Sequence, residues 1–208
     1  MPAYQLNINI TAADLQTIYA AKENIVLVKS VAGEAPFSWV SFPPFEGNAV
    51  TWNEENYSIY ASMGEGGGVI TSSVVQAAQP SQNYTFDQSG VFSQPSPVAI
   101  GSNAYQITNQ CSPGQGLLFG LAQTVSVNGT AHDNALINAQ FIPMGQHAIF
   151  RPATQLIIFL ASDVPAGVII DPATESGVVS QSTTITFVNG EVTANVTYDG
   201  NTGMFTQV

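Results

Sequence analysis

Few residues in this chain could carry nucleophilic or acid–base chemistry. Histidine occurs twice, as His132 and His147, and cysteine once, as Cys111. A nucleophilic centre needs Ser or Cys beside a base that a third group holds in place. His132 and Asp133 are neighbours that would face opposite sides of a strand, and no Gly-x-Ser-x-Gly motif occurs. We therefore expect no catalytic residue and a protein that is not an enzyme.

The metal-binding side chains are equally sparse. A zinc site needs three or four His, Cys or carboxylate ligands, and the two histidines and one cysteine show no such spacing. Asp199-Gly200-Asn201 has the start of a calcium loop, but the residues that follow contain no further acid. We interpret that segment as a turn and expect neither a metal ion nor a cofactor.

Adjacent carboxylates occur at Glu54 and Glu55, inside an aromatic-rich segment. In one straight strand, Val50 and Trp52 would face away from Tyr57 and Ile59. A hairpin with its tip at 53–56 places all four on one face, so the pattern favours a hairpin. Both carboxylates would then be solvated, which does not favour the paired acids of a glycosidase.

The tip of this expected hairpin is our candidate binding site. Carboxylate and amide oxygens beside an aromatic face suit a neutral sugar, which needs hydrogen bonds to its hydroxyls and a flat surface for its ring. The alternative is a merely solvated turn, with the aromatic residues of 37–60 packed in the core. The predicted ligand-binding residues are Trp52, Asn53, Glu54, Glu55, Asn56 and Tyr57.

Charge narrows the range of partners. The net charge is -11, the three cations being Lys22, Lys29 and Arg151, whereas 66 residues are Asn, Gln, Ser or Thr. Nucleic acids need a basic surface, and anionic lipids are disfavoured for the same reason. The expected partner is therefore a glycan or a protein surface, recognised mainly through uncharged hydrogen-bonding groups.

The periodicity of the chain indicates an all-β fold. Residues 4–10 alternate as a strand, after which Thr11 caps a short helix at 12–21. Asn128-Gly129 and Asn189-Gly190 indicate hairpin turns, the second placing Phe187 opposite Val192. Further strands are expected at 25–31, 69–78, 84–86, 104–108, 117–127, 135–142 and 155–161. About ten short antiparallel strands predict a two-sheet sandwich or jelly roll, with a closed barrel as the alternative.

The length of the chain indicates the number of domains, and the composition of its N-terminus indicates where in the cell the protein is expected. A chain of 208 residues fits one β-sandwich domain, 1–208. The N-terminus has no basic region followed by an apolar core, and no run approaches the roughly 18 apolar residues of a membrane helix. We expect no transmembrane segment and no signal peptide, and hence a cytoplasmic protein or one released by a non-Sec route.

Part of the sequence resembles a family of uncharacterised bacterial and fungal proteins. The similar residues are Trp39-Val40-Ser41-Phe42, Pro44-Phe45, Val50-Thr51-Trp52, Glu55, Tyr57 and Ile59-Tyr60-Ala61-Ser62, with 4–20 similar as well. The resemblance covers roughly the first third of the chain. It implies a single domain that starts near residue 1, and it carries no activity that could be transferred.

Three functions remain open from the sequence. The first is a lectin-like recognition module that binds neutral glycans through loops at one end of a sandwich. The second is a self-assembling structural protein, because surface charge usually protects strand edges and is scarce here. The third is a pore-forming or toxin-type protein, suggested by Ser- and Thr-rich amphipathic strands.

Overall fold

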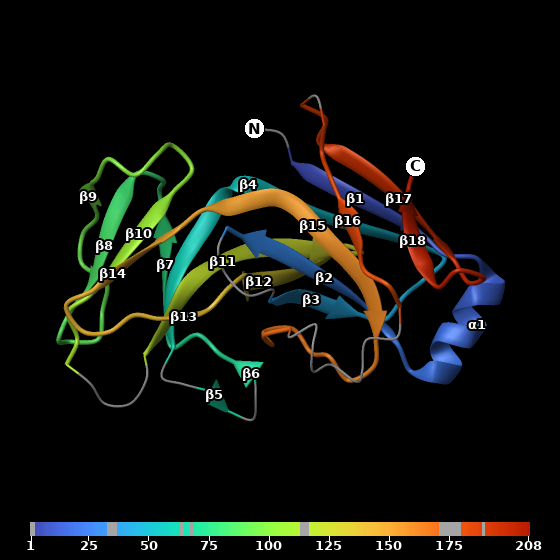
Figure 1. Ribbon diagram of the computed structural model, residues 1–208, viewed down its shortest axis with the longest axis horizontal. Helices are drawn as coiled ribbons and strands as arrows, with labels where there is room; N and C mark the ends of the chain where they lie inside the picture. The colour runs from blue at the N-terminus through green and yellow to red at the C-terminus, as the bar shows by residue number, and fades with distance from the viewer. Residues whose placement is uncertain are drawn as a thin grey trace.

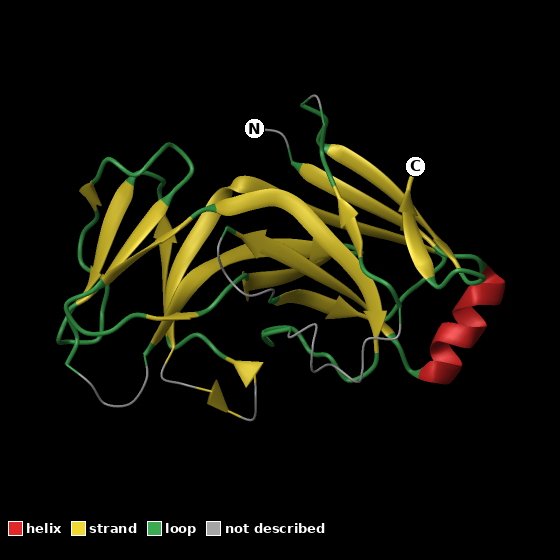
Figure 2. Cartoon of the chain, in the orientation of Figure 1, coloured by secondary structure: helices red, strands yellow, loops and turns green. Residues whose placement is uncertain are grey.

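Strands make up most of the chain, as the alternating sequence pattern predicts (Figure 2). The computed structural model describes residues 3–32, 37–62, 65–66, 69–112, 117–170, 180–188 and 190–208. Within these residues the single α-helix is α1 (Ala12–Ala21), which lies at one end of the molecule. The all-β class with one short N-terminal helix is therefore confirmed.

The largest sheet has six strands in a row, two further strands pairing off this path. Its long strands β4 and β11 pair with each other over most of their length, and β7 and β13 pair with β4 and β11 respectively. The row is β12 (Thr130–Leu136), β11 (Leu118–Val127), β4 (Gly47–Ser62), β1 (Tyr4–Asn9), β17 (Thr193–Asp199) and β18 (Met204–Gln207), with β7 (Val74–Ala78) and β13 (Gln140–Phe141) beside it.

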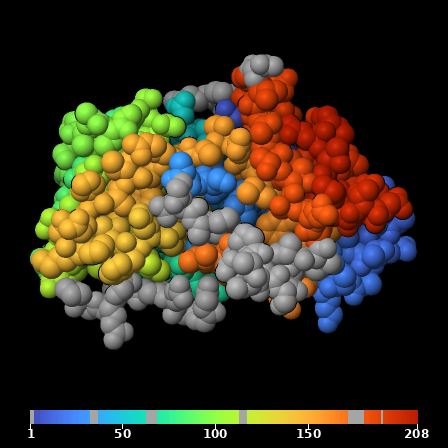
Figure 3. Space-filling model, viewed as in Figure 1, coloured from blue at the N-terminus to red at the C-terminus, as the bar shows by residue number. Residues whose placement is uncertain are grey.

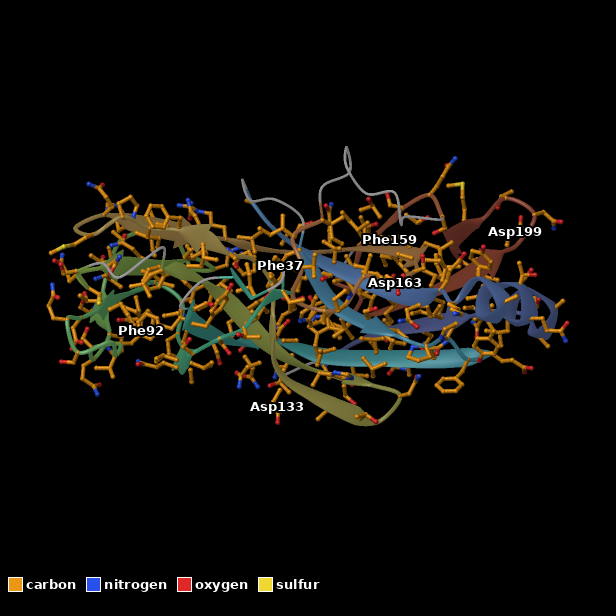
Figure 4. The ribbon with its side chains drawn as sticks, turned by 90° about the horizontal axis from the view of Figure 1, so that it is seen from below. Phe37, Phe92, Asp133, Phe159, Asp163 and Asp199 are labelled. Atoms are coloured by element: carbon orange, nitrogen blue, oxygen red, sulfur yellow. The ribbon has the colours of Figure 1, made fainter. Side chains whose placement is uncertain are left out.

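A second sheet forms the other layer of the sandwich (Figure 4). Its central strand β15 arches over the large sheet and lies on the front of the molecule, where it is orange in Figures 1 and 3. The strands in order are β16 (Thr183–Ile185), β15 (Pro152–Ala161), β2 (Asn24–Val31) and β3 (Ser38–Phe42). The sandwich that the sequence predicts is therefore present.

A smaller sheet lies at the end of the molecule opposite α1 (Figure 1). It consists of β14 (His147–Phe150), β10 (Tyr105–Asn109), β8 (Gln82–Phe86) and β9 (Ser96–Pro97). The short strands β5 (Glu65–Gly66) and β6 (Val69–Ile70) pair with each other. One continuous apolar cluster includes inward side chains from all three larger sheets, for example Leu6, Leu27 and Ile107.

Two local signals in the sequence are confirmed. The Thr11 hydroxyl accepts the Asp14 N–H at the start of α1, and the helix buries Leu15 and Ile18. At Asn128-Gly129 the turn residues have φ of 51° and 83°, and the turn joins β11 to β12 with Val127 opposite Thr130. Positive φ at both central residues is what a two-residue hairpin turn requires.

The strand pairing differs from the expected antiparallel pattern in two places. β1 pairs with β17 in parallel, and β8 pairs with β10 in parallel. Two predicted strands are also divided, because 69–78 contains β6 and β7 and 135–142 contains the end of β12 and β13. Pairing direction depends on where the chain returns from, which short-range alternation does not encode.

The predicted hairpin at Asn189-Gly190 is wrong as a pairing of strands. Asn189 itself lies outside the described residues, but a turn hydrogen bond joins the Glu191 N–H to the Val188 carbonyl over 3.0 Å. The strands on either side belong to different sheets, because β16 pairs with β15 whereas β17 pairs with β1 and β18. The turn therefore passes the chain from one layer to the other.

The sheets meet at one edge of the sandwich through side chains. The Gln207 amide of β18 donates to the Thr186 carbonyl and accepts the Thr186 N–H, over 2.8 and 3.1 Å. The Thr183 hydroxyl of β16 donates to the Phe205 carbonyl over 2.6 Å. These bonds tie the edges of β16 and β18 together.

No helix in the described residues has the length and apolar character to cross a membrane.

Candidate functional site

The segment predicted to be a hairpin tip is a bulge within one strand. β4 runs from Gly47 to Ser62 without turning back, so the hairpin at 53–56 is wrong. Along the pair with β11, Trp52 lies opposite Val125 and Tyr57 lies opposite Gln123. The interval of five residues from Trp52 to Tyr57 on β4 therefore pairs with an interval of only two residues, from Val125 to Gln123, on β11. β4 thus carries three extra residues at this point.

The bulge satisfies the same burial pattern that suggested a hairpin. An odd number of extra residues reverses the alternation, so the side chains before and after it face the same side. Trp52 and Tyr57 are 3% and 4% exposed. Trp52 packs against Trp39 and Tyr4, with ring centroids 5.6 and 5.7 Å away. The stacking surface for a sugar that we expected at Trp52 is therefore absent, because the ring is part of the core.

Glu54 turns inward at the bulge and accepts three hydrogen bonds. Oε1 accepts the Trp52 indole N–H and the Lys29 ammonium, each over 2.7 Å, and Oε2 accepts the Tyr57 hydroxyl over 2.6 Å. Its side chain is 14% exposed. The expectation that Glu54 is fully solvated is therefore wrong, since its carboxylate is held in a fixed orientation with a small part facing solvent.

Lys29 links the two layers of the sandwich. It lies on β2 in one sheet, is fully buried, and reaches across to Glu54 of β4 and to Gln123 of β11, whose Oε1 it contacts over 2.8 Å. Its ammonium also lies 5.1–5.5 Å from the ring centres of Trp39, Trp52 and Tyr57. A desolvated cation over aromatic faces gains electrostatic stabilisation. We call Lys29, Glu54 and Gln123 the interlayer triad.

Burial dominates the electrostatics of this group. It lowers the pKa of Lys29 to about 8, and the neighbouring Glu54 carboxylate offsets part of that effect. Burial, reinforced by the negative charge of Glu54, raises the pKa of Tyr57 well above its usual value. The pKa of Tyr105 is raised for the same first reason, with smaller effects from Tyr84, Glu54 and Glu55. Both phenols are therefore neutral at physiological pH and act as hydrogen-bonding or packing groups.

The remaining bulge residues shape the strand and face outward. The Asn53 carbonyl accepts the Gln123 amide over 2.7 Å, and its side-chain oxygen accepts the Glu55 N–H over 3.0 Å. The latter bond is a local turn of the kind that Asn favours. Glu55 and Asn56 are exposed. Of the six predicted site residues, Glu55 and Asn56 thus have the free, solvated side chains that we expected of the whole tip.

A pocket of about 440 Å³ opens beside the bulge. A second irregularity lies near it, because β15 carries two extra residues between Pro152 and Leu156, opposite Val31 and Lys29 of β2. The bends of β4 and β15 therefore bound the same space. The lining residues are Glu54, Glu55, Asn56 and Tyr57 from β4, with Gln79, Pro80, Ser102, Asn103, Tyr105, Pro152 and Thr154.

The pocket wall is rich in hydrogen-bonding groups. Amides, hydroxyls and two carboxylates surround the opening, and none of the described residues that line it is Lys, Arg or His. The rings of Tyr57 and Tyr105, whose centroids are 5.5 Å apart, provide an apolar part of the wall. Its size lies within the usual range of small-ligand sites, about 300–1,000 Å³.

A smaller cavity of about 240 Å³ lies near Cys111. Its wall is mainly apolar, formed by Ala61, Val74, Phe86 and Leu117. Residues 63–64 and 113–116, which adjoin it in sequence, are outside the described part of the chain. The pocket at the β4 bulge is therefore the better defined of the two, and it contains four of the six predicted residues.

The residues with reactive side chains lie elsewhere. His132 is on β12, His147 begins β14 and Cys111 follows β10, and none of them lines the pocket at the bulge. Within the described residues, no three His, Cys, Asp or Glu side chains come together as metal ligands do. Asp199 to Gly203 form a turn, as predicted, with the Gly203 N–H bound to the Asp199 carbonyl over 2.8 Å.

Sequence reasoning missed Lys29, Gln123, Tyr105 and the loops at 79–80 and 102–103. Lys29 had a detectable signal, because it has the same parity along its strand as the apolar residues Ile25 and Leu27, which face the core. The other residues had no local signal, since they approach β4 from distant parts of the chain.

Comparisons with known proteins add no family to these observations. No family model, no curated protein and no solved structure matches the chain. The resemblance of 39–62 to uncharacterised bacterial and fungal proteins stays a prediction, and any function must be argued from the residues themselves.

Proposed function

We propose that this protein is a non-enzymatic recognition module that binds a neutral glycan in the pocket at the β4 bulge. The observation that carries the proposal is the wall of this pocket, which combines two carboxylates, three amides and two hydroxyls with tyrosine rings. No Lys, Arg or His occurs among the described residues that line it. Sugar hydroxyls both donate and accept hydrogen bonds, so a wall of carboxylate and amide groups satisfies them.

The interlayer triad supports binding by fixing one part of this wall. Glu54 is oriented by three donors before any ligand arrives, so little ordering is needed on binding. A carboxylate has about four acceptor positions, which leaves room for a ligand hydroxyl at its exposed part. The site lies at a bulge between the layers, whereas the sequence suggested loops at one end of the sandwich.

The geometry of this site gives less support to a catalysed reaction than to binding. A nucleophile would need a Ser or Cys beside a base, and the two histidines and the cysteine lie outside the pocket. Glu54 is itself engaged by Lys29, Trp52 and Tyr57. A recognition role requires only the hydrogen-bonding wall that is present.

The self-assembly alternative rests on strand edges without charge. The edge strands β3, β16 and β18 contain no charged residue. However, the Ser38 N–H of β3 binds the Val168 carbonyl, and Gln207 and Thr183 bridge β18 and β16. Contacts within the chain thus already occupy part of each of these edges, and we favour glycan recognition.

A glycan array followed by calorimetry of the best neutral glycan tests the proposal. Asn103→Ala and Glu55→Ala remove polar groups from the wall without touching the triad, and each is expected to weaken binding at least fivefold. Asp133→Asn, an exposed change on β12, serves as the control and should bind as the wild type does. Full affinity in both pocket variants, or no neutral glycan bound at all, would overturn the proposal.

A further inference from the structure

The two adjacent carboxylates in the pocket at the β4 bulge are in different electrostatic states. Glu54 is paired with the buried Lys29, whose ammonium lies 2.7 Å from Oε1, so the pair carries no net charge. Glu55 lines the same pocket and is exposed, and its carboxylate forms no ion pair within the described part of the chain. The negative charge that the pocket presents to a ligand therefore comes from Glu55.

Arg151 is the cation nearest to this pocket along the chain, since it precedes Pro152 of the wall. Its guanidinium donates to the Ile100 carbonyl over 3.3 Å. Among the described residues the one ion pair is that of the interlayer triad, so Arg151 does not bind Glu55. The chain as a whole carries a charge of -11 and supplies no positive field that would cancel this carboxylate.

The Tyr105 hydroxyl is an unused polar group at this pocket. Tyr105 lines the wall and is only 3% exposed, yet its hydroxyl has no hydrogen-bond partner among the residues that the structure describes. Burial raises the pKa of Tyr105, and the charges of Tyr84, Glu54 and Glu55 raise it further, so both carboxylates act on this phenol. A nearly buried polar group without a partner is costly, and a ligand in the pocket would satisfy it.

These three groups favour one kind of ligand charge. A carboxylate or sulfate in the pocket would lie near Glu55 and meet no cation among the described lining residues. An ammonium group has three donors and no acceptor, so it matches the oxygens of Glu54, Glu55 and Tyr105. The rings of Tyr57 and Tyr105 in the wall also attract a cation. A sugar hydroxyl, which donates and accepts, lies between these two cases.

We propose that Glu55 sets the charge selectivity of this pocket. Sugars with a free amine bind most tightly, neutral sugars less tightly, and sugars that carry a carboxylate or sulfate are rejected. Glu54 contributes oriented hydrogen-bond acceptors without net charge, because Lys29 neutralises it. The inference rests on the proposed glycan-binding function and adds to it an order of preference by charge.

A charge series on one glycan scaffold tests this selectivity by calorimetry. The probes are the neutral glycan that ranks first on the array and two derivatives of it, in which one primary hydroxyl is replaced by an amine or oxidised to a carboxylate. At about pH 6 the amine is protonated and the acid is ionised. The carboxylate derivative should bind at least about tenfold more weakly than the amine derivative at low salt. Raising the salt concentration should narrow this difference, because Glu55 is exposed.

The ratio of the two dissociation constants is compared within each variant, so that any change in overall affinity cancels. Glu55→Gln removes the charge at nearly constant size and should lower the ratio at least threefold. Asp133→Asn removes one acid from an exposed position on β12, outside the pocket, and should keep the wild-type ratio. Arg151→Gln removes the cation nearest to the wall along the chain and should not lower the ratio.

The possible failures are distinguishable. If no neutral glycan binds, the proposed function is wrong and the inference fails with it. If the glycan binds but the ratio is close to one, or falls equally in Glu55→Gln and Asp133→Asn, the charge selectivity alone is wrong. A wild type that prefers the carboxylate derivative, and loses this preference in Arg151→Gln, would show that Arg151 recognises an acidic sugar instead.

Discussion

The Lys29 ammonium lies 2.7 Å from Oε1 of Glu54, and the two residues come from opposite layers of the sandwich. Glu54 also lines the pocket at the β4 bulge, so the contact adjoins that pocket. Because the lysine is fully buried and the glutamate nearly so, each charge depends on the other for its stability. The pair therefore fixes the bulge of β4 and, with it, the shape of the proposed binding site.

Removing one member of this pair should be costly. Lys29→Met would leave a nearly buried carboxylate without its cation, and the free energy of unfolding should fall by about 3–5 kcal/mol. Lys29→Met/Glu54→Gln removes both charges while the glutamine can still bond to Trp52 and Tyr57. The double variant should thus be more stable than the single one, as measured by urea denaturation. A single variant within about 1 kcal/mol of the wild type would contradict the buried pair.

The same lysine predicts how stability depends on pH. In the folded protein Lys29 has a pKa of about 8, against an ordinary value of 10.5. Below pH 8 both the folded and unfolded states carry this proton, whereas between about 8 and 10.5 the unfolded state holds it more fully. The free energy of unfolding should therefore rise with pH in this window, by roughly 3 kcal/mol at most from this group.

The tyrosines act in the opposite direction at higher pH. The raised pKa values of Tyr57 and Tyr105 stabilise the fold below pH 10, and that contribution is lost as the pH rises further. Urea denaturation from pH 7.5 to 9.5 separates the two effects. The charge-free double variant should show a flatter pH profile than the wild type, and parallel profiles would show that Lys29 does not titrate as its burial implies.

Alanine substitutions at neighbouring positions distinguish the bulge from a hairpin tip. Glu54→Ala removes an acceptor used by Lys29, Trp52 and Tyr57 and should cost about 3–5 kcal/mol. Glu55→Ala changes an exposed side chain and should cost less than about 0.5 kcal/mol. Thermal melts of the two variants give the comparison. Equal, small effects would mean that both side chains are solvated.

The bulge shows why the sequence predicts the burial of β4 but not its path. A hairpin and a bulge of three residues both place Trp52 and Tyr57 on one face, so the apolar pattern fits either. The choice depends on β11, whose residues Gln123 and Val125 set the register from about seventy positions away. The local turn at Asn128-Gly129 was predictable because its two residues alone determine the backbone. The hydrogen bond between the Glu191 N–H and the Val188 carbonyl also fits a local turn signal, whereas the pairing of the flanking strands was not predictable.

A close approach between β11 and the segment after β12 gives a further test. A side chain at Gly120 would meet the Asn138 carbonyl oxygen and lie 2.8 Å from the Tyr60 ring. Gly120→Ala should therefore destabilise the protein by about 1–3 kcal/mol through overpacking. Gly47→Ala is the matched control, since its added methyl group would meet nothing within 4 Å. Similar melting temperatures for both variants would contradict the packing of β11 against Asn138.

The candidate site was partly predictable for a related reason. Glu54, Glu55, Asn56 and Tyr57 were expected at the site from the sequence and do line the pocket. Trp52 was expected there and lies in the core instead, because its exposure depended on the hairpin. The opposite wall, including Asn103 and Thr154, comes from the loop before β10 and from β15, and only the fold brings these residues to β4.

Tryptophan fluorescence during a titration with the best neutral glycan tests the central claim most directly. The chain has two tryptophans, Trp39 and Trp52, and the Lys29 ammonium that binds Glu54 lies 5.3 and 5.5 Å from their ring centres. A glycan that engages Glu54 should change the emission saturably, with the same dissociation constant as calorimetry gives, and Asn103→Ala should shift the curve at least fivefold. Glycan binding that leaves the emission unchanged and is insensitive to Asn103→Ala would contradict the claim that this pocket is the binding site.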